Sequence, residues 1–299
     1  MTAALEPDAA GTTTQPHPPG RPHRRRAATK TAVAGVTVAG LSLTAIALQV
    51  AYPLTPGAAR DALTAAIVIV FSLASTAHAW VSRGRRAAGG LLLITAVGGY
   101  GVESLGLHAG FPFGTYAYND TLGPRIGGVP LIVGLAWTMF AWPAAVVAAR
   151  LTRRYWTRVV VGAWALAAWD VFLDPQMVQA GHWRWSFAGP ALPGIHTVPL
   201  TNHLGWLLVA TLMMCALVPL VGGPRADGWP YALFLWTWLS STLALGAFWG
   251  LAAAAGWGAL VLGLVGAPLL LSLPSGRILP EWAGPTAHSG NNRPLRAPR

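Results

Sequence analysis

The chain has 299 residues, of which 54% are hydrophobic and only 10% are charged, and its mean hydropathy is +0.50. Soluble globular domains carry about a quarter charged residues, so this composition argues against a water-soluble fold and for a polytopic membrane protein. The net charge of +11 does not indicate a nucleic-acid partner, because the basic residues lie in the termini and in alternate loops. The single cysteine, Cys215, lies inside an apolar run, which excludes a disulfide framework and a thiolate metal cluster.

The two ends of the chain differ from its middle. Residues 1–30 are rich in Pro, Thr and Arg without apolar periodicity, so we expect a disordered, basic, cytoplasmic tail. We expect a transmembrane helical domain over residues 31–273 and a second disordered, basic, cytoplasmic tail over residues 274–299.

Apolar runs near twenty residues long predict an all-α, polytopic transmembrane helical bundle of about eight spans. The expected spans are roughly 31–52, 60–82, 87–108, 128–149, 156–175, 202–221, 229–249 and 251–272. Almost nothing joins the last two, so a tight hairpin and one long broken element, which would make seven spans, are both open.

The basic residues predict how the bundle is oriented. Of the 20 Lys and Arg residues, only Arg60, Arg125 and Arg184 fall in outer regions when the N-terminus is placed inside, and the other seventeen fall in inner regions. Cytoplasmic loops of membrane proteins carry an excess of Lys and Arg. We therefore expect a multi-pass cell-membrane protein with both termini in the cytoplasm.

The other polar residues gather toward the opposite, outer face. Inner loops hold arginine but almost no acid, whereas the outer third of the bilayer and the outer loops hold most of the remaining polar groups. These are Glu103, His108, Asp120, Arg125, Asp170, Asp174, His182, Arg184, His196, Asn202 and His203. Ionisable groups at membrane depth are costly, so we expect the chemistry on the non-cytoplasmic side.

Two aspartates end the fifth span. Asp170 and Asp174 are spaced i, i+4 and so stand on one helical face, and Pro175 is expected to end the helix there. Asp174 is then either functional or simply solvated at the interface. Asp170 lies one turn deeper, beside Trp164 and Trp169, where desolvation favours a protonated carboxyl suited to general-acid catalysis.

Glu103 lies at similar depth on the third span, within the glycine-rich stretch GGYGVESLGLHAG. Small residues let helices approach closely in a membrane, so the third and fifth spans could bring Glu103 near Asp170. Two buried carboxyls in different environments can form an acid/base pair. The alternative is a structural hydrogen bond across helices.

Aromatic residues mark the outer loop FPFGTYAYNDTLGPRIGGVP and the spans around it. Phe111, Phe113, Tyr116 and Tyr118 form either an interfacial belt or the mouth of a pocket for a long apolar ligand. Several of the fifteen tryptophans lie within spans, where indole faces either stabilise a cation or simply pack the core. These are Trp137, Trp142, Trp164, Trp169, Trp236 and Trp238.

The histidines near the spans do not predict a metal site. His78, His108, His182, His196 and His203 are scattered singly, with no HxxxH, HxxH or HExxH spacing. We therefore expect no bound metal or haem, and the sequence contains no glycine-rich phosphate loop with its lysine.

Three blocks together resemble a known family. GVESLGLHAGFPFGTYAYNDTLGPRIGGVPLIVGLAW, WDVFLDPQMVQAGHWRW and PLTNHLGW are similar to the membrane-bound carotenoid biosynthesis proteins of the carotenoid 1,2-hydratase type, which include the bisanhydrobacterioruberin and γ-carotene hydratases. The resemblance covers roughly residues 90–215. One departure is GIHTVPLTN, where His196 and Thr197 lengthen the stretch before Asn202.

The resemblance implies addition of water across the terminal C1–C2 double bond of an acyclic carotenoid end group in the bilayer, without a cofactor. An acid must protonate C2, aromatic faces can stabilise the tertiary cation at C1, and a base must orient the attacking water. We infer Asp170 or Glu103 as the acid and Asp174 as the base. Supporting donors would be Asn202, His203 and His182, and Trp183 and Trp185 would shape the pocket.

Two other functions fit the same sequence. A carotenoid or isoprenoid cyclase starts from the same protonation but loses a proton instead of capturing water. A non-catalytic lipid-binding or transport protein is the alternative outside enzymes, and its expected hallmark is an internal repeat with paired broken helices, of which the sequence gives no convincing sign.

Overall fold

The structure is a computed structural model that describes residues 21–186, 189–225 and 227–273. Residues 1–20 of the N-terminal tail expected over residues 1–30, and the C-terminal tail expected over residues 274–299, lie outside the described residues. The first helix, α1 (Arg21–Ala51), begins at Arg21 rather than at residue 31.

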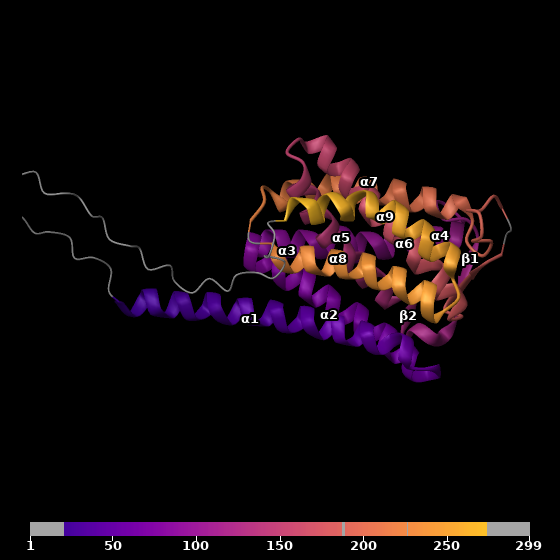
Figure 1. The fold of residues 1–299 in the computed structure, drawn as a ribbon, viewed down its shortest axis with the longest axis horizontal. Helices are drawn as coiled ribbons and strands as arrows, with labels where there is room; N and C mark the ends of the chain where they lie inside the picture. The colour runs from indigo at the N-terminus through magenta and orange to yellow at the C-terminus, as the bar shows by residue number, and fades with distance from the viewer. Residues whose placement is uncertain (1–20, 187–188, 226, 274–299) are drawn as a thin grey trace, which may run out of the picture.

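The described residues contain eight helices long and apolar enough to cross a membrane, which confirms the predicted all-α transmembrane bundle. The helices lie roughly along the long axis of the molecule, with α3 toward one end and β1 and β2 toward the other (Figure 1). The spans comprise α1 with the short helix η1 (Tyr52–Leu54), α2 (Gly57–Arg83), α3 (Arg85–Leu91) joined through the π-helical η2 (Leu92–Val97) to α4 (Gly98–Ala109), α5 (Leu131–Leu151), α6 (Tyr155–Gln179), α7 (Leu200–Val221), α8 (Gly228–Leu243) with the π-helical η4 (Ala244–Phe248), and α9 (Ala252–Ser272).

The last two predicted spans are separate helices, so the count is eight rather than seven. η4 ends at Phe248 and α9 begins at Ala252, and Gly250 between them has a φ of 66°. A positive φ costs glycine little, which suits it to this tight connection.

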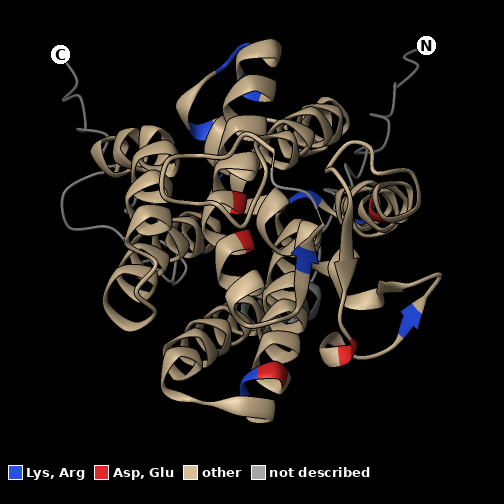
Figure 2. Ribbon diagram, turned by 90° about the vertical axis from the view of Figure 1, so that its right-hand side faces the viewer, with Lys and Arg blue, Asp and Glu red and all other residues tan. Residues whose placement is uncertain are grey.

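Helices α5 and α6 form the centre of the bundle. α5 contacts α2, α6, α7 and α8, and α6 contacts α7 and α9 on its other sides. The interior is closely packed, and Trp137, Phe140 and Trp142 of α5 are fully buried. In the end view, acidic positions lie in the middle of the bundle as well as on its periphery (Figure 2).

The loop after α4 and the loop after α6 meet in a small antiparallel ribbon that was not predicted from the sequence. β1 (Tyr116–Tyr118) pairs with β4 (Trp183–Trp185), with Tyr116 opposite Trp185 and Tyr118 opposite Trp183. Because side chains alternate along a strand, the two tyrosines share one face with the two tryptophans. A second short pair, β2 (Arg125–Ile126) with β3 (Val129–Pro130), completes the loop after α4.

Glycines seat this loop between α4 and α7. A Cβ atom on Gly106 would lie 2.8 Å from the Phe113 ring, and one on Gly205 would lie 2.6 Å from the carbonyl oxygen of Pro112. Contacts this short exclude larger side chains, so the small residues allow the loop to enter the bundle rather than lie on its surface.

The prediction that Pro175 ends the fifth span is wrong, because α6 continues to Gln179. Proline in a helix removes one hydrogen bond and crowds the preceding turn, but surrounding protein can offset this cost inside a bundle. Here Pro175 and Met177 are buried, and backbone hydrogen bonds from Ala180 to Gln176 and from His182 to Met177 hold the next turn. Asp174 therefore lies inside a packed helix with 3% exposure, which also contradicts a solvated interfacial position.

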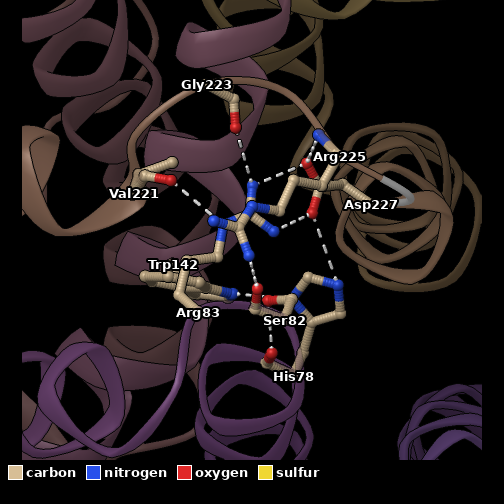
Figure 3. A network of polar contacts seen from close by, with 8 residues as sticks. All are labelled: His78, Ser82, Arg83, Trp142, Val221, Gly223, Arg225 and Asp227. Atoms are coloured by element: carbon tan, nitrogen blue, oxygen red, sulfur yellow. Dashed lines mark hydrogen bonds and ion pairs between the residues drawn. The ribbon is translucent and has the colours of Figure 1, made fainter. Parts of the chain in front are cut away.

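A buried polar network joins the C-terminal end of α2 to the connection between α7 and α8 (Figure 3). Arg83 pairs with Asp227, Asp227 also accepts from the backbone nitrogen of Arg225 at 2.9 Å, and His78 Nε2 lies 3.6 Å from Asp227. The indole Nε1 of Trp142 donates to His78 Nδ1 at 3.0 Å. α2 is about 40 Å long at ~1.5 Å per residue, so this network lies far from the β1–β4 ribbon at the opposite end of the bundle.

Candidate functional site

A cavity opens inside the half of the bundle that carries the β1–β4 ribbon. Its volume is about 160 Å³, roughly ten times the space that one water molecule requires. Its walls come from α1, η1, α2, α4 to α8, η4 and the ribbon, and they include a large share of the residues predicted from the sequence. These are Glu103, Phe113, Tyr116, Tyr118, Trp137, Trp169, Asp174, Trp183, Trp185 and Asn202.

Glu103 of α4 lies in the cavity wall and accepts three hydrogen bonds. The hydroxyls of Tyr116 and Tyr118 donate to its Oε2 at 2.7 and 2.8 Å, and the indole Nε1 of Trp137 donates to its Oε1 at 3.1 Å. Burial, with the Glu103 carboxylate nearby, raises the pKa of Tyr116 and of Tyr118, so both hydroxyls keep the protons they donate. Donors aimed at both oxygens suit a carboxylate.

Asp170 and Asp174 of α6 are bridged by one side chain of α7. The amide nitrogen of Asn202 donates to Asp170 Oδ2 at 2.9 Å and also to Asp174 Oδ2, and the two carboxyls are in hydrogen-bonding contact with each other. Trp183 Nε1 donates to the other oxygen of Asp174 at 3.1 Å. Asp174 faces the cavity, whereas Asp170 is fully buried behind it.

His203 extends this polar group into the contact between α6 and α7. Its Nδ1 lies 3.0 Å from Asp170 Oδ2. His203 Nε2 and Asp170 Oδ1 are buried and have no hydrogen-bond partner among the described residues. The side chains of Asp174, Asn202, Asp170 and His203 thus form one continuous chain that leads away from the cavity.

Aromatic rings cover the remaining walls. Trp137 stacks on Trp206 with ring centroids 3.8 Å apart and an interplanar angle of 18°, and Trp169 meets Trp206 edge-on at 6.0 Å. Phe113 packs 6.4 Å from Trp137 and 6.5 Å from Trp206. The face of an aromatic ring carries the negative part of the ring quadrupole, which attracts a desolvated cation.

The structure brings Glu103 and Asp174 to one cavity, whereas the sequence analysis paired Glu103 with Asp170. The spacing i, i+4 places both aspartates on one side of α6, but only the residue nearer the ribbon reaches the cavity wall. Asp170 is connected to the cavity through Asn202 and Asp174 rather than by direct exposure to it.

Other predicted residues lie outside the cavity. Phe111 is 60% exposed at the loop tip, and His203 contacts Asp170 from behind. His182 is buried in the loop, where its Nδ1 lies 2.7 Å from Thr121 Oγ1; burial lowers its pKa, and Asp61 at 3.9 Å opposes that shift. Of the six tryptophans singled out above within the predicted spans, four lie outside the cavity lining: Trp142, Trp164, Trp236 and Trp238.

The lining residues that the sequence did not predict include Trp206, Gln176, Tyr52 and Trp249. Trp206 could have been found, because it follows Asn202 by four residues and so shares its helical face. Gln176 follows Pro175, where the helix was expected to have ended. Tyr52 and Trp249 come from the ends of η1 and η4, and no local pattern predicts that these segments meet.

Comparison with known proteins places the chain in a family. The sequence profile of the family described as carotenoid biosynthesis protein matches residues 63–271, well over half of the chain. The chain belongs to this carotenoid biosynthesis family.

A curated relative is the bisanhydrobacterioruberin hydratase of Haloarcula japonica. It is 29% identical over 136 residues, a stretch that covers 41% of this chain and 42% of that protein. The alignment therefore spans less than half of the relative's length. No solved structure matches the chain.

Proposed function

We propose that this multi-pass membrane protein is a carotenoid 1,2-hydratase, which adds water to the terminal C1–C2 double bond of an acyclic carotenoid end group and forms a tertiary alcohol. One observation carries the proposal: the carboxyls of Glu103 and Asp174 line a single aromatic cavity inside the bundle. The family membership and the name of the Haloarcula relative support the same substrate class and reaction.

Asp174 acts as the acid. Asn202 bonds an oxygen of each carboxyl, and ionising both of two adjacent buried carboxyls is costly, so Asp170 and Asp174 hold one proton between them in the resting site. Asp174 is the member that faces the cavity, and it delivers this proton to C2 while the alkene electron pair forms the new C–H bond. Asn202, which bridges both carboxyls, and His203, which contacts Asp170, keep the pair aligned.

Glu103 acts as the base. Its three hydrogen-bond donors suit an anion, and a carboxylate in the cavity wall stabilises the cation that develops at C1. The water oxygen attacks C1 and its proton passes to Glu103, so one water is consumed and no electron acceptor is needed. A proton returning from Glu103 to the aspartate pair through cavity water resets the site.

These roles differ from the sequence-based assignment, which made Asp170 or Glu103 the acid and Asp174 the base. The hydrogen-bond donors around Glu103 and the direct contact between the aspartates favour the reverse order. The apolar remainder of the carotenoid would stay in the bilayer while its end group reaches the cavity. With both termini in the cytoplasm of a cell-membrane protein, the cavity would open on the non-cytoplasmic side.

The test is expression in cells that accumulate lycopene, followed by chromatography and mass spectrometry of the pigments. We expect more polar pigments, heavier by one or two waters, with an unchanged chromophore. An isomeric product of unchanged mass and altered absorption would identify a cyclase instead. Absence of hydrated product from both lycopene and a bacterioruberin-type acyclic precursor, with the protein present in the membrane, would overturn the proposal.

A further inference from the structure

A second pocket, called the outer pocket, lies against one end of the main cavity. It has a volume of about 310 Å³ and is lined by Arg60, Gln179, Ala180 and Phe248 together with three residues that also line the main cavity. These shared residues, Tyr52, Gln176 and Trp249, form the wall between the two spaces and are called the shared wall below.

The shared wall combines aromatic faces with polar atoms. Tyr52 and Trp249 meet edge-on with ring centroids 5.3 Å apart, and the Tyr52 hydroxyl accepts from Thr64 Oγ1 at 3.3 Å. The indole Nε1 of Trp249 is buried and has no hydrogen-bond partner among the described residues. A buried donor without a protein partner is usually satisfied by a bound water.

A positive charge stands on the outer-pocket side of this wall. The Arg60 guanidinium lies 6.0 Å from the Tyr52 ring centre and 5.9 Å from the Trp249 ring centre, and its Nε donates to the carbonyl of Thr55 at 2.6 Å. Gln179 donates to the carbonyl of Trp249 at 3.1 Å. The outer pocket is therefore polar and can hold water.

Two of the three wall residues lie where regular α-helix gives way to another backbone conformation. Trp249 follows the π-helical η4 and Tyr52 begins the short helix η1, whereas Gln176 follows the proline inside the continuous helix α6. π-helical turns often occur at functional sites. Three distant segments therefore meet at the boundary between the two spaces.

We propose that the outer pocket is the water inlet of the enzyme and that the shared wall passes single waters from it to the cation. This inference rests on the proposed hydratase function. The reaction consumes one water in each turnover while the carotenoid end group fills the aromatic cavity, so the nucleophile needs an entry separate from that of the substrate. Gln176 and Trp249 Nε1 offer hydrogen bonds to water along the path.

The fate of the cation gives a measurement that reports on water supply alone. If water arrives, its oxygen bonds to C1 and the alcohol forms. If water is late, the cation loses a proton from a neighbouring carbon and an alkene returns. In D₂O the acid delivers a deuteron, so the returned alkene carries deuterium, and the ratio of alcohol to deuterated alkene measures how often water captures the cation.

The experiment uses membranes containing the full chain, with lycopene as substrate in D₂O, and compares Gln176→Leu and Trp249→Phe with the unaltered protein. Gln176→Leu removes the side-chain amide and keeps its bulk, and Trp249→Phe removes the indole N–H and keeps an aromatic ring. We expect each to lower the ratio about fivefold or more, the change that loss of one hydrogen bond produces in a rate. Because the ratio is internal to each sample, lower protein accumulation leaves it unchanged.

Trp164→Phe is the matched control for Trp249→Phe, because Trp164 lines neither of the two spaces and its indole Nε1 donates to the carbonyl of Val261. Its ratio should equal that of the unaltered protein. The inference is overturned if the ratio stays constant in both wall variants, or if Trp164→Phe lowers it equally. If the unaltered protein yields neither alcohol nor deuterated carotenoid, the hydratase function itself fails, which is a different result from a failure of the inlet.

Discussion

Trp137 donates its indole N–H to Glu103 at 3.1 Å while its ring stacks on Trp206 in the cavity wall. One side chain therefore supplies both a hydrogen bond to the proposed base and an aromatic face for the proposed cation. The two contributions separate in Trp137→Phe, which keeps a ring but removes the donor. Hydrogen bonds to charged groups contribute about 1.5–3 kcal/mol, so we expect hydration to slow about tenfold or more.

The measurement is the initial rate of alcohol formation per amount of folded protein in the membrane. Trp169→Phe is the control, because Trp169 lines the same cavity without donating to Glu103. A Trp137→Phe rate no lower than that of the control would contradict a role for this hydrogen bond.

The two aspartates of α6 should differ in their effect on proton delivery. Asp174→Asn removes the carboxyl that faces the cavity, so both hydration and deuterium exchange from D₂O should fall about 100-fold or more. Asp170→Asn keeps that carboxyl but removes the partner that shares its proton, and a measurable rate with an altered pH profile should remain. Mass spectrometry of the carotenoids follows both reactions. An inactive Asp170→Asn beside an active Asp174→Asn would make Asp170 the acid.

Glu103→Gln should behave differently from both aspartate variants. The amide keeps the shape of the side chain but cannot accept the proton of the attacking water. We therefore expect alcohol formation to fall about 100-fold while deuterium exchange into the unhydrated carotenoid persists. Loss of exchange together with hydration would assign Glu103 to protonation instead.

The buried polar network around Arg83 and Asp227 lies away from the cavity, so a substitution in it should lower stability without a direct effect on the cavity. Asp227 is 1% exposed and neutralises Arg83, so Asp227→Asn leaves a buried guanidinium unpaired. We expect a loss of about 3–5 kcal/mol in the free energy of unfolding. Thermal unfolding of the detergent-purified protein measures it. Asp61→Asn is the control, because that carboxyl is partly exposed and lies 3.9 Å from His182, so its change should stay below about 1 kcal/mol.

The sequence predicts the eight spans because the bilayer imposes a strong local requirement on each helix. It also gathers Glu103, Asp174 and Asn202 at one end of the bundle, where they line a single cavity, since polar groups at membrane depth are costly anywhere except in a site. The course of α6 beyond Pro175 was not predictable from local rules, because packing around the proline offsets its intrinsic cost.

The features that the sequence does not predict depend on contacts between segments far apart in the chain. The pair of Arg83 and Asp227 joins residues 144 positions apart, and the facing of Tyr52 and Trp249 depends on how η1 meets η4. Hydropathy patterns report which face of a helix is apolar, but not which neighbour covers it. Asp170 and Asp174 differ in such neighbours, because Trp183 of β4 donates to Asp174 at the cavity wall whereas His203 of α7 contacts Asp170 behind it.

Orientation in the membrane is a prediction from the basic residues that labelling can test. Cys215 is the single cysteine, so Cys215→Ala gives a background in which one new cysteine reports its own accessibility. Ile126 is exposed in the outer turn, and Arg153 is exposed between α5 and α6 at the opposite end. With both termini in the cytoplasm, a membrane-impermeant maleimide should label Ile126→Cys in intact cells but Arg153→Cys only after permeabilisation. The reverse pattern would invert the bundle and place the cavity on the cytoplasmic side. That result would contradict the orientation predicted from the excess of arginine at the end opposite the cavity.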